Sequence, residues 1–405
     1  MTTVSPRAAA LGGAATVSAA AAWSRWRFNQ PLFEDFEELE KLARRRIPRD
    51  LFSAFGHGAD LGETRALNES SFREISFRPR AATRASVPRD LSTTVLGTKL
   101  SFPVLPSSMG SLRAIRPDGV LAIVRAAGAE GAAAIVGTSA GHSAAEAKAA
   151  ASGPLWFQSY WWSKRITERE IGRAAEQGYQ ALVMTVDCPY LFPKKQRATG
   201  LMNALSLRSA LQFGPQLLTR PNWTANFVRD GVRTQLAVAR KMAVPDPSVP
   251  MTATWEELEW VRERWAGPLI LKGITRVEDA KRAVAVGADG ISVSNHGGFV
   301  MDGIPPTVRS LPAIVDGVGD QVDVFMDGGI RHGSDVVKAI ALGAKAVFVG
   351  SPMAMALAAA GEAGVRKMLT ILREEMDSTM ATLGASSVHE LDRSWVGIPQ
   401  SWARD

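Results

Sequence analysis

Short apolar runs rich in β-branched residues recur along most of the chain, each separated from the next by a longer segment. We predict eight strands: 102–107, 133–137, 155–160, 181–187, 269–273, 290–295, 322–327 and 346–350. Helical periodicity marks segments between them and one segment before the first strand: 33–46, 118–129, 168–177, 277–286 and 334–342. Apolar strands alternating with helices indicate an α/β fold whose parallel sheet is covered on both faces.

This alternation fits either a doubly wound open sheet or a closed (β/α)8 TIM barrel, and three features favour the barrel. The strands number eight. Chemically distinctive residues stand at the C-terminal ends of many strands, where barrel active sites lie. No G-x-G-x-x-G turn follows the first strand, as a dinucleotide-binding sheet would require. We therefore predict a flexible N-terminal extension over 1–32 and a TIM barrel over 33–405 that begins with a helical segment.

One connection is much longer than the others. Residues 190–256 follow the fourth strand and contain no clear strand of their own. A segment of that length in a compact domain is usually a lid or a binding loop. We predict that it folds over the active-site end of the barrel; the alternative is a disordered surface insertion.

Composition and charge limit the classes of partner that the protein is expected to bind. Among the 405 residues, 46% are hydrophobic and the net charge is +7. Lysine and arginine are scattered along the chain, which argues against nucleic-acid binding. A phosphate-bearing cofactor and an acidic substrate would account for the positive net charge.

No apolar run reaches the length of a membrane span, and the Ala/Gly-rich stretch 8–22 lacks the bulky apolar centre of a signal peptide. The only cysteine, Cys188, cannot form an internal disulfide, so we expect a cytoplasmic protein.

Three polar residues at strand ends carry candidate chemistry. His296 lies in Ser-Asn-His-Gly-Gly, residues 294–298, after the sixth strand, where the glycines leave room for a planar ligand. Asp187 ends the fourth strand, and a carboxylate beside an imidazole fixes its tautomer and raises its basicity. Lys272 ends the fifth strand, where it could form a Schiff base or act as a fixed cation beside developing negative charge. A purely structural histidine is the alternative for His296.

Glycine-rich turns after the last two strands predict a phosphate site. Residues 327–331 form Asp-Gly-Gly-Ile-Arg, and Gly350-Ser351 follows the eighth strand. Turns after strands 7 and 8 of a barrel, together with a helix N-terminus, commonly bind phosphate. Arg331 could add bidentate contacts. Asp-Gly-Gly also makes ordinary turns, but two such turns on adjacent strands favour a site.

Together these residues resemble a known family, the FMN-dependent α-hydroxy acid oxidases and dehydrogenases. The similarity covers residues 36–390 and rests on segments in the family's order: 158–160, 185–187, 294–298, 327–344 and 361–365. The resemblance implies FMN as cofactor, no metal, and a homo-oligomer, by analogy a tetramer.

The resemblance also implies a role for each site residue. His296 would remove the substrate proton with Asp187 behind it, Tyr160 would bond to the reacting oxygen or nitrogen, and Lys272 would stabilise negative charge on the reduced flavin. The implied flavin-binding residues are Pro106, Ser107, Ser108, Gly137, Gln158, Thr185, Lys272, Ser294, Asp327, Gly328, Gly329, Arg331, Gly350 and Ser351.

Departures from the family pattern change the expected substrate. Phe299 stands where the family has an arginine that pairs with the substrate carboxylate, and Lys194 stands in place of a second arginine. A substrate tyrosine is replaced at Ala54 and an aromatic residue at Ser139, while Ser351 stands for a phosphate-side arginine. Losing a charge-assisted pair removes roughly 1.5–3 kcal/mol, so an enzyme for lactate or glycolate would hardly discard it.

We therefore predict oxidation of a C–H bond next to OH or NH in a larger, peptide- or natural-product-derived substrate. The branch of the family that matures the peptide-derived redox cofactor mycofactocin is similar, since it too lacks the arginine after His-Gly-Gly and has segments like 219–223 and 386–391. Three alternatives stay open: a conventional 2-hydroxy acid oxidase with Lys194 or a loop arginine as a relocated carboxylate clamp, a flavin-binding scaffold without turnover, and a membrane-associated dehydrogenase that reduces quinone.

Overall fold

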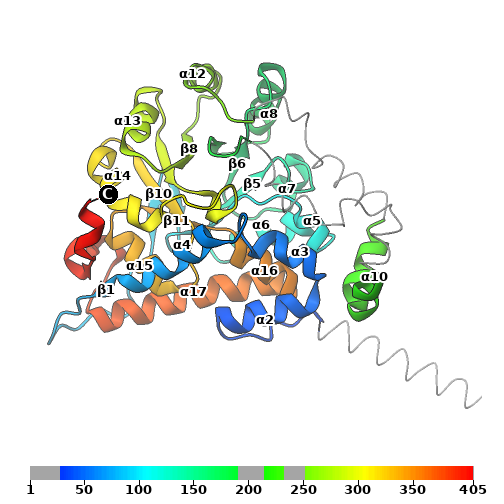
Figure 1. The fold of residues 1–405 in the computed structure, drawn as a ribbon, viewed down its shortest axis with the longest axis horizontal. Coiled ribbons are helices and arrows are strands. Elements are labelled where there is room, and N and C mark those ends of the chain that lie inside the picture. Colours follow the sequence, from blue (N-terminus) through cyan, green and yellow to red (C-terminus); the bar gives the residue numbers. More distant parts are fainter. Residues whose placement is uncertain (1–27, 190–213, 232–250, 405) are drawn as a thin grey trace, which may run out of the picture.

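Eight parallel strands form a nearly closed barrel in the computed structural model, which describes residues 28–189, 214–231 and 251–404 (Figure 1). Their order around the sheet is β4-β11-β10-β9-β8-β7-β6-β5, and β4 lies against β5 where the barrel closes. The predicted TIM barrel is thus confirmed. The strands are β4 (Val104–Pro106), β5 (Ala134–Gly137), β6 (Leu155–Ser159), β7 (Ala181–Thr185), β8 (Leu269–Ile274), β9 (Gly290–Val293), β10 (Asp323–Asp327) and β11 (Ala346–Val349).

The strands are apolar because both of their faces are buried. Inside the barrel, Trp156 packs edge-on against Phe325, with ring centroids 5.6 Å apart, and Phe325 stacks on Phe348 at 5.1 Å. Val95 and Leu100, from the hairpin of β2 (Thr93–Val95) and β3 (Thr98–Leu100), join the same interior cluster. The interior is therefore a packed core, and the open space lies at the ends of the strands.

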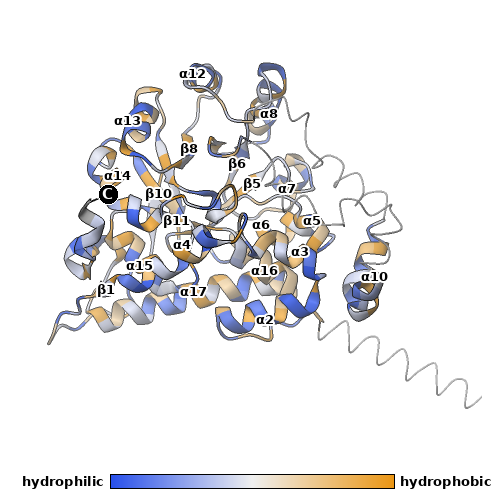
Figure 2. Cartoon of the chain, in the orientation of Figure 1, coloured by the Kyte–Doolittle hydropathy of each residue, from blue (hydrophilic) through white to orange (hydrophobic). Residues whose placement is uncertain are grey.

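Helices cover the outside of the barrel. Along the longest of them, α17 (Glu362–Leu383), Val365, Met368, Leu369 and Leu372 are buried at helical spacing. Figure 2 accordingly shows hydrophobic and hydrophilic residues alternating around this helix. The other outer helices are α5 (Leu112–Ile115), α6 (Gly119–Ala129), α7 (Ala144–Ala150), α8 (Lys164–Glu176), α12 (Trp255–Arg264), α13 (Val277–Ala285), α14 (Thr307–Val318), α15 (Gly333–Ala341) and α16 (Ser351–Ala360).

The sequence-based helix positions hold with small shifts at their ends. The first predicted helix begins at Phe36, three residues later than expected, because the Asp35 side chain accepts a hydrogen bond from Glu38 N and caps α2 (Phe36–Arg46). Conversely, α8 begins at Lys164, four residues earlier than expected, after the capping residue Ser163.

Two further N-terminal helices bring the start of the chain to the active-site region. These are α3 (Arg49–Gly56), which packs on α16, and α4 (Glu63–Glu74), which packs on the turn that carries His296. Of the proposed extension 1–32, only residues 28–32 belong to the described part. Within it, Phe28 is buried, and the guanidinium groups of Arg46 and Arg116 lie over its ring.

The long connection after β7 is described in part. Its helix α10 (Pro221–Arg229) docks beside α5: buried Trp223 donates from Nε1 to the Ala114 carbonyl at 3.1 Å, and Arg113 forms an ion pair with Asp230. Residues 190–213 and 232–250 lie outside the described part, so the lid remains a prediction. None of the described helices has the length and apolarity needed to cross a bilayer.

Candidate active site

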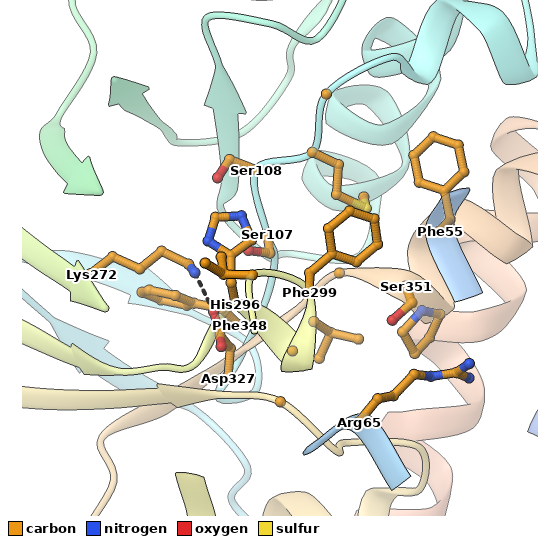
Figure 3. A pocket seen from close by; sticks show the side chains of 18 of the residues that line it. Phe55, Arg65, Ser107, Ser108, Lys272, His296, Phe299, Asp327, Phe348 and Ser351 are labelled. Atoms are coloured by element: carbon orange, nitrogen blue, oxygen red, sulfur yellow. Dashed lines mark ion pairs between the residues drawn. The ribbon is translucent and has the colours of Figure 1, made fainter. Parts of the chain in front are cut away.

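A pocket lies at the C-terminal end of the barrel strands, bordered by α3 and α4 (Figure 3). Figure 3 shows Lys272 and His296 at one end, Ser351 and Arg65 at the other, and Phe299 between them. The pocket brings together most of the predicted site residues. Those that line it are Ala54, Ser107, Ser108, Ser139, Gln158, Tyr160, Lys272, His296, Phe299, Asp327, Gly328, Gly329, Arg331, Gly350 and Ser351.

Other predicted residues stand directly behind the pocket wall. Thr185, at the end of β7, accepts a hydrogen bond from Gln158 Nε2 at 3.0 Å and so fixes that amide. Gly137, at the end of β5, lies under the same side chain: a Cβ there would come within 2.8 Å of Gln158 Oε1. Pro106 ends β4 and is buried. Lys194 lies outside the described residues.

The structure brings His296 and Asp187 together. His296 Nδ1 is 3.1 Å from Asp187 Oδ1, and the imidazole is 26% exposed toward the pocket. Burial alone would raise the pKa of Asp187, but the charge and hydrogen bond of His296, with Lys272 nearby, outweigh it and lower the pKa. An ionised Asp187 can only accept hydrogen bonds, so Nδ1 carries the hydrogen and Nε2 is left with a lone pair able to take a proton.

Lys272 belongs to a buried cluster of three side chains. Its Nζ is 2.7 Å from Asp327 Oδ2 and donates to Ser294 Oγ at 2.9 Å, while Ser294 Oγ donates to Asp327 Oδ1 at 2.7 Å. Burial alone would lower the pKa of Lys272, but Asp327 and then Asp187 outweigh it and raise the pKa. The amine is therefore held as a cation. A Schiff base needs the neutral amine, so this geometry favours the fixed-charge role.

Tyr160 is a buried phenol that lines the same pocket and is close enough to Asp187 to feel its charge. Its ring contacts Trp162 edge-on, with centroids 5.9 Å apart, and packs with Cys188 and Met251. Burial, followed by Cys188 and Asp187, raises the pKa of Tyr160 well above its usual value. The hydroxyl consequently remains protonated and can donate a hydrogen bond to a bound molecule.

The turn after β10 leads toward the other end of the pocket. Gly328 and Gly329 have φ values of 93° and 85°, and a Cβ at Gly329 would lie 2.2 Å from the Asn68 carbonyl oxygen. Position 329 therefore needs glycine both because its φ is positive and because a Cβ would collide with the backbone of α4. Arg331 follows with its side chain 9% exposed. At this end of the pocket, α16 begins at Ser351, whose backbone N–H has no partner within the helix, whereas Pro352 has no N–H and Met353 N donates to the Gly350 carbonyl.

Helix α4 contributes site residues that were not predicted from the sequence. Arg65 lines the pocket, Glu69 accepts from Arg331 Nη2 at 2.6 Å, and Asn68 exchanges two amide hydrogen bonds of 2.9 Å with Asn295, next to His296. Positions 65, 68 and 69 share one face of a helix. That spacing was the available signal, provided that a helix was assigned there.

The pocket wall around Phe299 is apolar. Phe55, Met109 and Val300 line it together with Phe299 and Ala54. Among the described lining residues, the side chains with a permanent positive charge are Lys272, Arg65 and Arg331. Lys272 is paired with Asp327. Arg65 lies toward the Ser351 end in Figure 3, and Arg331 shares the Glu69 carboxylate with it. Phe299 and the other four residues of this wall carry no charge, so the wall itself supplies no cation to hold a substrate carboxylate.

Comparison with known proteins agrees with this geometry. The FMN-dependent dehydrogenase family model matches residues 43–398. Pre-mycofactocin synthase of Mycobacterium tuberculosis is 40% identical over 387 residues, covering 92% of this chain and 96% of the relative. Human 2-hydroxyacid oxidase 1 is 37% identical over 371 residues, covering 89% and 95%.

A solved structure shows the same fold over nearly the whole chain. The crystal structure of the monotopic membrane protein (S)-mandelate dehydrogenase superposes with a TM-score of 0.82 at 30% identity, covering 91% of this chain and 100% of that one. The family expected from the sequence, and with it FMN as cofactor, are confirmed. This chain belongs to the FMN-dependent dehydrogenase family and is an FMN-dependent oxidoreductase of the α-hydroxy acid oxidase type.

Proposed function

We propose that this enzyme oxidises a C–H bond next to OH or NH in a substrate that is not anchored by a carboxylate, such as a peptide- or natural-product-derived compound. The observation that carries the proposal is the apolar wall at Phe299, whose own residues carry no charge. Similarity to pre-mycofactocin synthase supports a substrate other than a simple 2-hydroxy acid.

The pocket residues fit FMN. Gly137 leaves space beside the Gln158 amide, where a Cβ would collide with Oε1 at 2.8 Å, and the fixed cation Lys272 suits the flavin edge that becomes negative on reduction. At the other end, the Nε of Arg331 is buried without a hydrogen-bond partner among the described residues, which suits a phosphate. The proposed set is Pro106, Ser107, Ser108, Gly137, Gln158, Thr185, Lys272, Ser294, Asp327, Gly328, Gly329, Arg331, Gly350 and Ser351. Bound FMN supplies the two-electron acceptor for the oxidation.

The residues of this chain handle the proton. His296 Nε2 takes it from the substrate, and Asp187, 3.1 Å from Nδ1, stabilises the imidazolium that forms. The Tyr160 hydroxyl donates to the reacting oxygen or nitrogen. Ala54, Ser139 and Phe299 border the substrate side of the pocket.

The main alternative is a conventional 2-hydroxy acid oxidase with a relocated carboxylate clamp, for which Lys194 is the candidate. Family membership and the presence of His296, Asp187, Tyr160 and Lys272 favour an enzyme over a flavin-binding scaffold. We also propose a cytoplasmic homo-oligomer, a tetramer by the family resemblance; light scattering of the purified protein measures that state.

The test is anaerobic bleaching of the bound flavin by a panel of candidate substrates. Peptide-derived compounds with a C–H bond next to NH should bleach it, and lactate and glycolate should leave the spectrum unchanged. Rapid bleaching by the small acids and none by the other compounds would favour the relocated clamp.

A further inference from the structure

Two arginines reach the Ser351 end of the pocket from different elements. Arg331 comes from the turn after β10 and Arg65 from the first turns of α4, and both line the pocket with Gly329 and Gly350. Figure 3 shows the Arg65 guanidinium near Ser351. The side chain of Arg331 is 9% exposed and that of Arg65 is 19% exposed. These are unusually buried positions for two like charges that share one pocket.

One carboxylate serves both guanidinium groups. Glu69 Oε1 accepts from Arg331 Nη2 at 2.6 Å, and the same oxygen lies 3.2 Å from Arg65 Nε. The contact between Arg65 Nε and Glu69 is an ion pair without hydrogen-bond geometry. The Nε of Arg65 and the Nε of Arg331 are therefore both buried without a hydrogen-bond partner among the described residues. Glu69 is thus the carboxylate that contacts both cations, and the attraction of the more weakly acting Glu40 for Arg65 does not offset the repulsion from Arg331.

Burial and repulsion both disfavour the charged form of Arg65. Burial is the larger effect, and the nearby Arg331 adds to it, so that the pKa of Arg65 is lowered despite Glu69. A bound dianion would remove this repulsion and complete the hydrogen bonding of both groups.

The backbone around the arginines is also suited to an anion. Gly350 caps the ten-residue helix α16 without a side-chain hydrogen bond, so the N–H of Ser351 is not occupied by a capping side chain. Gly329 has a φ of 85° and leaves the turn beside Arg331 without side chains. Ser351 itself brings only a neutral hydroxyl, so the positive charge at this end comes from the two arginines.

We infer that Arg65 binds the phosphate of FMN together with Arg331, so that a residue of α4 supplies the second guanidinium of the phosphate site. Glu69 is the positioning residue for both arginines. The inference rests on FMN binding in this pocket but not on the identity of the proposed substrate.

The test compares two flavins that differ only in the phosphate. FMN and riboflavin are titrated into the full-length protein after removal of its flavin, and binding is followed by quenching of flavin fluorescence. Arg65→Ala should weaken FMN binding by about 10- to 100-fold, the effect of losing one charge-assisted contact. Riboflavin binding should not change. Arg65→Lys, which keeps the charge but not the planar donors, should lie between Arg65→Ala and the wild type.

Two further variants sharpen the comparison. Arg73→Ala removes an exposed arginine from the same helix and should leave both affinities unchanged. Adding Ser351→Arg to Arg65→Ala should recover part of the FMN affinity, because it returns a guanidinium to the same end of the pocket.

The other outcomes overturn the inference in distinguishable ways. An unchanged FMN affinity in Arg65→Ala and Arg65→Lys would mean that Arg65 does not contact the phosphate. An equal loss for FMN and riboflavin would make Arg65 a structural residue of α4. A wild-type protein that binds neither flavin would overturn the cofactor assignment itself, whereas the substrate proposal is tested separately by the bleaching panel.

Discussion

At the scale of single residues, the neighbours of the reactive groups set their protonation. Asp187 is held ionised beside His296, which directs the hydrogen of the imidazole to Nδ1 and leaves Nε2 as the base. Asp327 keeps Lys272 charged, and burial keeps Tyr160 neutral. The pocket therefore offers one proton acceptor, one fixed cation and one hydrogen-bond donor at the same end.

Replacing His296 tests the proton transfer. His296→Asn should retain FMN and the fold, because the side chain is 26% exposed and ends in the pocket rather than in the core. Reduction of the flavin by the true substrate should slow by about 10^2- to 10^4-fold, the usual contribution of a positioned base. Stopped-flow absorbance measures the rate, and flavin content is the control. Loss of FMN or of folding would assign His296 a structural role.

Phe299 is the residue that we expect to set the charge preference. Phe299→Arg should raise the preference for a 2-hydroxy acid over its neutral amide by about 10- to 100-fold, since it places a guanidinium in the apolar wall. The ratio of the two kcat/KM values measures the effect. Phe299→Leu, which is equally apolar, should leave the ratio unchanged. If Phe299→Arg also leaves it unchanged, the preference is determined elsewhere, most simply in the connection 190–256.

At the scale of elements, α4 supports both ends of the pocket. Its backbone packs against Gly298 of the catalytic turn η2 (His296–Gly298), and its side chains reach Asn295 on one side and Arg331 on the other. One helix thus positions both the turn of the base and the proposed phosphate site.

Adjacent glycines in η2 allow this packing to be measured. Both have positive φ, 64° at Gly297 and 74° at Gly298, so alanine is strained at either position. A Cβ at Gly297 meets no atom within 4 Å, whereas one at Gly298 would lie 2.5 Å from Arg65 N. Gly297→Ala should lower the free energy of unfolding by about 1–2 kcal/mol, and Gly298→Ala should lower it by clearly more. If urea unfolding showed the same loss of unfolding free energy for both variants, α4 would not be packed tightly against the turn.

A partly buried carboxylate, Glu170, joins α8 to β6 and makes the stability depend on pH. Ser159 Oγ lies 2.9 Å from the Tyr160 carbonyl oxygen and 2.5 Å from Glu170 Oε2, and its one hydrogen can serve only one of them. Burial raises the pKa of Glu170 from 4.5 to about 7, although Ser159 opposes the shift. A protonated Glu170 donates to Ser159 Oγ, which resolves the conflict.

The raised pKa of Glu170 makes the folded protein less stable as the pH rises. The folded state keeps a proton that the unfolded state releases, so stability is full below a pH of 4.5 and falls as the pH rises toward 7. Glu170→Gln should therefore gain on the order of 1–3 kcal/mol over the wild type at pH 8 and little near pH 4.5, by urea unfolding. Glu176→Gln, on the exposed side of the same helix, should show no such change with pH. A pH-independent difference for Glu170→Gln would contradict the assignment.

At the scale of the whole molecule, the barrel followed from the sequence because its strands are continuous apolar runs. The helix α4 did not, because its buried face is mostly polar: Thr64, Asn68 and Ser71 are buried there beside Phe72. Hydrophobic periodicity is weak in such a helix, and Gly62 precedes it without a capping side chain.

The candidate site, like the fold, was predictable from the sequence only in part. Residues at strand ends could be predicted because a parallel barrel gathers all its C-terminal ends at one face, and the structure does bring Asp187 to His296. Arg65 was missed, since it enters the pocket from outside the strand-and-turn pattern and only its helical spacing with Asn68 and Glu69 marked it.

We propose above that this flavin enzyme does not select its substrate by a carboxylate. The most direct measurement is anaerobic reduction of the bound flavin by matched pairs that share one carbon skeleton, such as mandelate with mandelamide and lactate with lactamide. We predict that the neutral amide reduces the wild-type flavin at least as fast as the acid. A preference of about tenfold or more for the acid, equivalent to roughly 1.4 kcal/mol, would contradict it and indicate a carboxylate clamp.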